Sequence, residues 1–155
     1  MKGNDLVIAK LNFLLADELT AISQYMVQAE MCANWGYKEL AEVIEKRAID
    51  EMKHAEKLIA RILFLDGIPA VASLNKLKIG ALVENQLKND LLAEDHTLKI
   101  YNEGIHLATK LTDSGTRELL EAILLEEERH IDWLEAQLSQ IKQMGIQNYL
   151  ADQTN

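Results

Sequence analysis

Two short motifs place a carboxylate and an imidazole three residues apart. In a helix, Glu51-x-x-His54 and Glu127-x-x-His130 would each project both side chains from one face. Mixed carboxylate and imidazole donors suit iron or manganese and also accept zinc, whereas the absence of a thiolate pair argues against a structural zinc site. We therefore expect each motif to bind one metal ion, with redox-active iron as the preferred metal.

A repeat in the sequence connects these motifs to two further glutamates. Three pairs of residues are each 76 positions apart (94 − 18, 127 − 51 and 130 − 54): Glu18 and Glu94, Glu51 and Glu127, and His54 and His130. The first pair interrupts two apolar helical stripes, and a charge that faces a core requires compensation. Two halves related by a pseudo-two-fold axis would bring all six side chains around one centre. Four carboxylates would offset two Fe²⁺ ions, so the repeat predicts a di-iron site.

Tyr25 and Tyr101 share the same offset, and each lies two helical turns from its glutamate. We expect Tyr25 to orient a ligand carboxylate and to donate an electron during oxidation, although a core tyrosine with a hydrogen-bonded hydroxyl fits the pattern too. Glu103-x-x-His106 lies outside the repeat, because Val27 and Glu30 stand 76 positions before it. We expect this third motif on a solvated face, and His96 to be an ordinary helix residue.

The apolar spacing predicts four long helices and a short fifth one. Two short turns flank one long crossover, which is the connectivity of a ferritin-like four-helix bundle rather than an up-down-up-down bundle. The predicted segments are a helix from Asn4–Asp5 to about Asn34, a second from about Leu40 to Leu65, a crossover over Ile68–Gly80, helices over about Leu82–Lys110 and Thr116–Met144, and an amphipathic tail over Ile146–Asp152. We expect one all-α domain over residues 1–155.

The composition supports the all-α fold class and limits the kinds of partner that the protein can bind. Hydrophobic residues make up 48% of the 155 residues, aromatic residues only 5%, and there is a single Pro. The net charge of −9 disfavours nucleic acid and anionic membranes but attracts cations. Cys32 has no partner for a disulfide, and neither a signal peptide nor a long apolar run is present. We expect a soluble, cytoplasmic protein.

Several stretches closely resemble the bacterioferritin family, and the resemblance covers nearly the whole chain. They are Met1–Gly3, Asn34–Gly36, Ile49–Ala55, Arg61–Leu65, Lys76–Gly80, Glu127–Glu135 and Met144–Leu150. The resemblance implies iron storage in a hollow homo-oligomeric shell of 24 subunits, with a ferroxidase centre in each bundle. It also implies haem b between paired subunits and a ferredoxin-type reductant for iron release.

The resemblance assigns roles to individual residues. Glu18, Glu51 and His54 would bind one iron, Glu94, Glu127 and His130 the other, and Glu51 and Glu127 would bridge the two. Met52 matches the axial haem ligand, and Asp50 matches an inner-surface iron contact. Glu45 and Lys46 stand where family members often have a Tyr near the haem and a His on the cavity wall. These two departures bear on haem affinity and on the route of iron into the cavity.

Two other functions remain open on the sequence. One is a di-iron or di-manganese peroxidase of the rubrerythrin or manganese catalase type, which the lack of a Cys-x-x-Cys module disfavours. The other is a haem-binding dimer, or a ligand-poor subunit that serves only assembly and electron transfer, which the complete set of six ligands disfavours. The sequence does not choose between O₂ and H₂O₂ as oxidant.

Overall fold

The computed structural model describes residues 1–155 and contains five helices and no strand. The helices are α1 (Asp5–Asn34), α2 (Lys38–Phe64), α3 (Val83–Lys110), α4 (Ser114–Met144) and α5 (Ile146–Ala151). The predicted ferritin-like four-helix bundle with a short C-terminal helix is confirmed. The helix α4 begins two residues earlier than predicted, because Asp113 accepts a hydrogen bond from the backbone N–H of Thr116 and caps the helix. None of the helices has the run of apolar residues that a membrane crossing requires.

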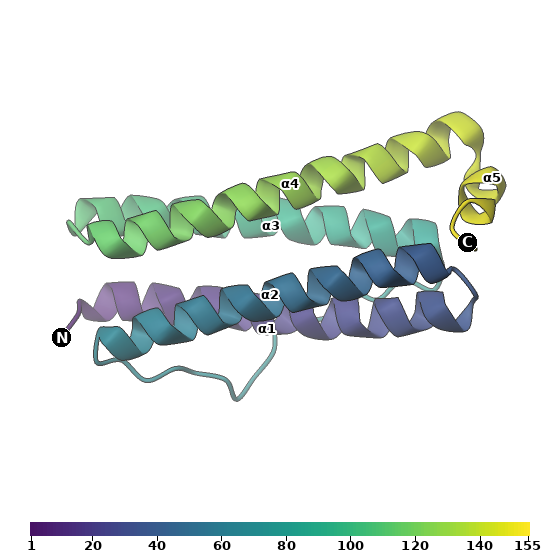
Figure 1. The fold of residues 1–155 in the computed structure, drawn as a ribbon. Helices are drawn as coiled ribbons and strands as arrows, with labels where there is room; N and C mark the ends of the chain where they lie inside the picture. The colour runs from purple at the N-terminus through teal and green to yellow at the C-terminus, as the bar shows by residue number, and fades with distance from the viewer.

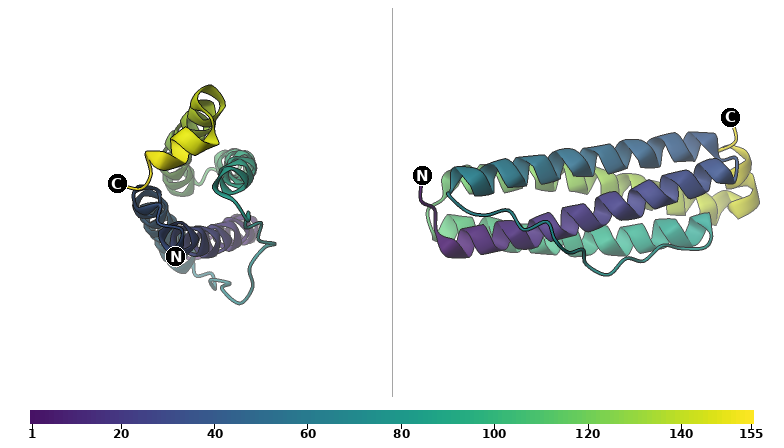
Figure 2. Two further views of the ribbon diagram at one scale, coloured as in Figure 1. Left: turned by 90° about the vertical axis from the view of Figure 1, so that its right-hand side faces the viewer. Right: turned by 90° about the horizontal axis from the view of Figure 1, so that it is seen from below.

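The bundle consists of two antiparallel helix pairs, α1 with α2 and α3 with α4 (Figure 1). The crossover leaves α2 at one end of the bundle and runs along its outside to the other end, where α3 begins (Figure 2). As a result, α3 runs antiparallel to α1, and α4 antiparallel to α2. This is the arrangement that a pseudo-two-fold axis across the bundle requires.

Side chains of α1 hold the crossover in place. The Asn12 side chain donates to Ile68 O at 3.0 Å and accepts from Ala70 N at 2.8 Å. Further along, Thr20 Oγ1 accepts from Asn75 N at 2.8 Å. The crossover therefore lies against α1 as a defined wall, although it contains no helix or strand of its own.

The short helix α5 closes one end of the bundle (Figure 1). It follows Gly145, whose φ of 82° lies in the left-handed region that favours glycine. Tyr149 is buried, and its hydroxyl donates to Gln137 Oε1 at 2.8 Å. Beyond α5, Gln153 O accepts from Glu39 N at 3.1 Å, which satisfies a free N–H in the first turn of α2.

Two apolar clusters fill the interior, and a polar layer lies between them. One cluster includes Leu11, Leu58 and Leu120, and the other includes Tyr25, Leu87 and Leu134. Leu15 belongs to the first cluster and is fully buried.

Candidate metal centre

The polar layer between the two apolar clusters contains all six residues of the sequence repeat. Each of them is buried. Their ligand atoms form two overlapping groups, within each of which all atoms lie within 4.8 Å of one another: Glu18, Glu51, His54 and Glu127, and Glu51, Glu94, Glu127 and His130. Glu51 and Glu127 are common to both groups. The repeat thus correctly predicts which side chains meet, while their role as metal ligands stays a prediction.

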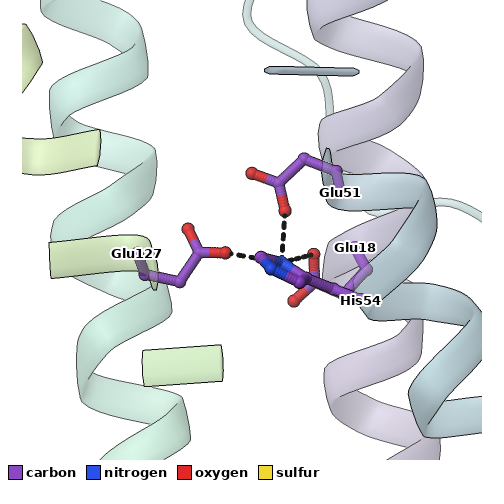
Figure 3. Close-up of side chains that lie close together, drawn as sticks. All are labelled: Glu18, Glu51, His54 and Glu127. Atoms are coloured by element: carbon purple, nitrogen blue, oxygen red, sulfur yellow. Dashed lines mark hydrogen bonds and ion pairs between the residues drawn. The ribbon is translucent and has the colours of Figure 1, made fainter. Parts of the chain in front are cut away.

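His54 lies at the centre of the first group. Figure 3 shows Glu18, Glu51 and Glu127, from α1, α2 and α4, directed toward its ring. The His54 Nδ1 atom is 2.8 Å from Glu127 Oε1, 3.2 Å from Glu51 Oε2 and 3.6 Å from Glu18 Oε2. The opposite ring nitrogen, Nε2, lies 2.6 Å from Glu126 Oε2. Glu126 therefore orients the ring so that Nδ1 faces the cluster.

The second group centres on Glu94. His130 Nδ1 lies 2.8 Å from Glu94 Oε1, and the Tyr25 hydroxyl donates to the same oxygen at 2.5 Å. Trp133 stacks on the His130 ring at a centroid distance of 6.0 Å and fixes the plane of the imidazole. Both groups therefore present an Nδ1 atom to the cluster from a ring that other side chains hold in place.

The two tyrosines of the repeat bond reciprocally across the bundle. Tyr25 on α1 donates to Glu94 on α3, and Tyr101 on α3 donates to Glu18 on α1. Burial, followed by the charge of nearby carboxylates, raises the pKa of both phenols, so both remain protonated donors. The predicted orienting contact of Tyr25 is present, but its electron-donor role is a prediction that the geometry does not test.

Arg47 is a cation in the cluster that the repeat does not predict. Its side chain enters from α2, one helical turn before Glu51, and is 8% exposed. The Nη2 atom lies 2.5 Å from both Glu51 Oε1 and Glu127 Oε2, and 3.5 Å from Glu94 Oε1. The sequence offered one signal, since Arg47 precedes Glu51 by four positions on the same helical face.

Burial and neighbouring charge set the protonation of the cluster. Burial, together with repulsion from Glu18, raises the pKa of Glu51, and burial with repulsion from Glu94 does the same for Glu127. Burial alone would lower the pKa of His54, but its bonds to the surrounding carboxylates outweigh that effect and raise it. Burial alone would raise the pKa of Glu94, but hydrogen bonding and positive charge from His130 and Arg47 outweigh burial and lower that pKa. The protein thus compensates its buried acids with protons and cations.

Glu94 Oε2 is a buried carboxylate oxygen with neither a hydrogen bond nor an ion pair, whereas Glu51 Oε1 and Glu127 Oε1 are compensated by Arg47 Nη2 at 2.5 Å and by His54 Nδ1 at 2.8 Å. Such buried acceptors are costly unless a cation or donor satisfies them. Oxygen and imidazole donors from four helices match the preferences of iron, manganese or zinc. The donor set therefore fits a pair of divalent ions.

Cavities reach the cluster from two sides of the bundle. One of about 500 Å³ lies among α1, α3 and the crossover, and its walls include all four cluster glutamates together with Asn75, Lys76 and Lys78 of the crossover. A second of about 360 Å³ lies between α2 and α4 and includes Arg47, Asp50, Glu126, Arg129 and His130. The predicted crossover therefore contributes directly to the site, because it forms part of the wall of a cavity that reaches the cluster.

The remaining predicted residues lie outside the cluster. Glu103 and His106 are exposed, as expected, and Glu103 pairs with Lys10. His96 is exposed as well. Met52 is 44% exposed on the outer surface of α2, and Asp50 is partly exposed in the α2–α4 cavity. Haem ligation by Met52 and iron contact by Asp50 remain predictions.

Asp90 is a buried acid near the cluster that sequence reasoning missed. It accepts hydrogen bonds from Gln24 Nε2 at 2.7 Å and from Gln28 Nε2 at 3.0 Å. Burial is the largest influence and raises the pKa of Asp90 to about 7. No metal motif or repeat includes Asp90, so only its place in an apolar helical stripe signalled that it would be buried.

Comparison with known proteins agrees with the fold and the cluster. Residues 8–144 match the family model of the ferritin-like domain. Bacterioferritins from Mycolicibacterium paratuberculosis and Rhodobacter capsulatus are 41% and 40% identical to the chain, over 97% and 96% of its length and 95% and 92% of theirs. Bacterioferritin BfrA of Mycobacterium tuberculosis is 40% identical over 97% of the chain and 95% of its own length. The chain therefore belongs to the bacterioferritin family.

The raised pKa of Asp90 predicts a pH-dependent effect of Asp90→Asn. The folded protein binds this proton more tightly than the unfolded chain, so Asp90 costs stability as the pH rises from about 4 to about 7. The uncharged amide should raise the thermal midpoint by roughly 5 °C at pH 8 and have little effect near pH 4.5. The unbonded Gln28 Oε1 offers an acceptor to the new amide.

Differential scanning calorimetry at several pH values measures this difference. Asp95→Asn, an exposed substitution on the same helix, is the matched control and should show no such trend. Equal destabilisation by Asp90→Asn at both pH values would show that the charged form of Asp90 is not disfavoured in the folded protein.

Proposed function

We propose that this protein stores iron and oxidises Fe²⁺ to Fe³⁺ at a two-iron ferroxidase centre within each bundle. The observation that supports this most directly is the pair of overlapping ligand groups, which share Glu51 and Glu127 and are otherwise distinct. Family membership supports iron storage as the wider role. Ferrous ions are the substrate, and a ferric mineral in the cavity of a shell is the product.

The arrangement assigns a position to each donor. Glu51 and Glu127 lie between the two groups and would bridge the ions, while Glu18 with His54 and Glu94 with His130 would complete one side each. Two ions held side by side can deliver two electrons together, which reduces O₂ to H₂O₂ or H₂O₂ to two waters with uptake of two protons. Four carboxylates stabilise the higher charge of the ferric product.

The surrounding side chains keep these donors in position. Glu126 holds the His54 ring, Trp133 holds the His130 ring, and Tyr25 and Tyr101 each fix one carboxylate. The Tyr25 hydroxyl is also close enough to the second group to supply an electron, which is the further role we propose for it. Iron would enter from the α1–α3 cavity, where the four glutamates form part of the wall.

Substitution of the proposed ligands tests the ferroxidase function. Glu18→Ala, Glu94→Ala and His130→Ala should each lower the initial rate of ferrous oxidation at least tenfold, because each removes a donor from a site that requires both ions. Anaerobic Fe²⁺ titration followed by rapid mixing with O₂ or with H₂O₂ measures the rate, and we expect a break at two irons per chain.

The chain provides a matched control in its third Glu-x-x-His motif. Glu103→Ala and His106→Ala remove the same chemical groups from an exposed face and should leave the rate unchanged. Unchanged oxidation in the three ligand variants would contradict the proposal. Loading with Mn²⁺ in preference to Fe²⁺, with peroxidase activity, would instead favour a di-manganese or di-iron peroxidase.

We also propose that haem b binds between paired subunits through Met52. The thioether is exposed, and Ile49, one helical turn earlier on the same face, is exposed to the same extent of 44%. An outward apolar face with a thioether fits a haem that a second chain covers from the opposite side. Bound haem supplies a one-electron redox centre, which a ferredoxin-type reductant would serve during iron release.

Replacement of the sulfur tests this haem site. Met52→Leu preserves the apolar volume, so the chain should fold and pair normally but lose most of its haem absorbance after reconstitution with haem b. Met144→Leu, at another partly exposed methionine, is the control and should retain haem. Equal haem content in both variants would rule out Met52 as the axial ligand.

The proposed shell is testable by native mass. A homo-oligomer of 24 chains of 17.5 kDa each would have a mass of about 420 kDa. Sedimentation velocity of the metal-free protein measures this directly. A stable species of one or two chains at micromolar concentration would contradict storage in a shell, while leaving the ferroxidase proposal intact.

A further inference from the structure

Arg47 places a permanent positive charge where the second ligand group would bind an ion. Its Nη2 atom is within 3.5 Å of one oxygen from each of Glu51, Glu94 and Glu127. These are the three carboxylates that form the second group together with His130. The guanidinium therefore takes part of the coordination space that a metal ion in this half requires.

The space among these three carboxylates cannot hold both the Arg47 guanidinium and a divalent metal ion. Metal–oxygen bonds of about 2.0–2.2 Å would put a divalent ion in direct contact with Nη2, with strong repulsion in a buried site. A guanidinium does not deprotonate in proteins, so it cannot relieve that repulsion by losing its charge. Arg47 must move before this half of the centre fills.

The contacts of Arg47 permit such a movement. All three ion pairs involve the single atom Nη2, and the buried Nε makes no hydrogen bond. Arginine–carboxylate pairs are frequently bidentate, with two parallel N–H donors, whereas Arg47 contacts each of its carboxylates through one atom. The α2–α4 cavity of about 360 Å³ adjoins Arg47, and its wall includes the partly exposed Asp50, whose carboxylate can receive the displaced charge.

The charge also makes the two halves of the centre unequal. The 76-residue repeat places Ile123 at the position that corresponds to Arg47, and Ile123 is fully buried in an apolar cluster. None of the ion pairs of Arg47 involves Glu18 or His54. Of the three carboxylates that Arg47 contacts, Glu51 and Glu127 belong to both halves and Glu94 belongs only to the half with His130, so the arginine lies on the Glu94–His130 side.

We propose that Arg47 is an internal counter-cation of the metal-free centre, which competes with the metal ion of the Glu94–His130 half and moves into the α2–α4 cavity when that ion binds. This inference rests on the proposed two-metal centre and adds an order of filling to it. The Glu18–His54 half fills first, and displacement of Arg47 limits the affinity of the second half.

Calorimetric titration of metal-free protein with Zn²⁺ tests the competition without redox chemistry. We expect the full-length protein to bind two ions per chain, the second at least tenfold more weakly than the first. Arg47→Gln should tighten the second step at least tenfold and leave the first within about twofold. Arg47→Lys, which retains a cation, should remain closer to the original protein.

Arg129→Gln is the matched control. Arg129 lines the same cavity and carries the same charge, but it is exposed and makes no ion pair with the cluster. The control should leave both Zn²⁺ steps unchanged. A second step that is equally tight in the original protein and in Arg47→Gln, or that disappears in Arg47→Gln, would overturn the inference.

Two further results separate this inference from the proposed function. Binding of only one Zn²⁺ by the original protein but of two ions by Arg47→Gln would support the competition while contradicting a working two-metal centre in the natural chain. Binding by neither would overturn both. A crystal structure of the unmodified protein with Zn²⁺ provides a test that needs no variant, and Arg47 still bound to Glu51 and Glu127 beside two ions would refute the displacement.

Discussion

The burial of four carboxylates at one level of a helical bundle is the constraint on which the rest of the structure depends. Carboxylates this close together in a poorly solvated interior repel one another strongly, so each one requires a bound proton, a hydrogen-bond donor or a nearby cation. The structure supplies all three kinds of compensation. Two phenols donate to Glu18 and Glu94, His54 and Arg47 contribute positive charge, and burial favours protons on Glu51 and Glu127.

This layer also explains why the bundle has two separate apolar clusters. Leu and Ile side chains pack above and below the polar layer and supply the apolar burial that opposes its cost. The crossover serves the same layer from outside. By spanning the length of the bundle it makes α3 antiparallel to α1, and it also forms part of the wall of a cavity that reaches the glutamates.

The fold and the meeting of the six side chains were accessible from sequence because both depend on periodicity. Apolar spacing located the helices, and the 76-residue repeat placed Glu18 beside Glu51 and Glu94 beside Glu127 across chain segments far apart. Arg47 was not accessible in this way. Its position four residues before Glu51 is equally compatible with an ion pair on the helix surface. Only the packed structure shows that the Arg47 side chain turns inward to three carboxylates.

Other residues were missed for related reasons. Glu126 and Trp133 act on the two imidazoles from positions that no repeat connects, and Asp90 is held by amides rather than by a recognisable motif. Patterns along one helix do not show how deeply a neighbouring helix covers it.

The reciprocal tyrosine bonds have a mechanical consequence for the bundle. Tyr25 of α1 donates a hydrogen bond to a carboxylate of α3, and Tyr101 of α3 donates one to a carboxylate of α1. Axial sliding of either helix past the other would therefore stretch both hydrogen bonds at once. Rotation of one helix about its own axis would likewise drag a carboxylate on its neighbour. The pair resists shear in both directions, so the spacing between the two halves is set at the layer where that spacing matters most.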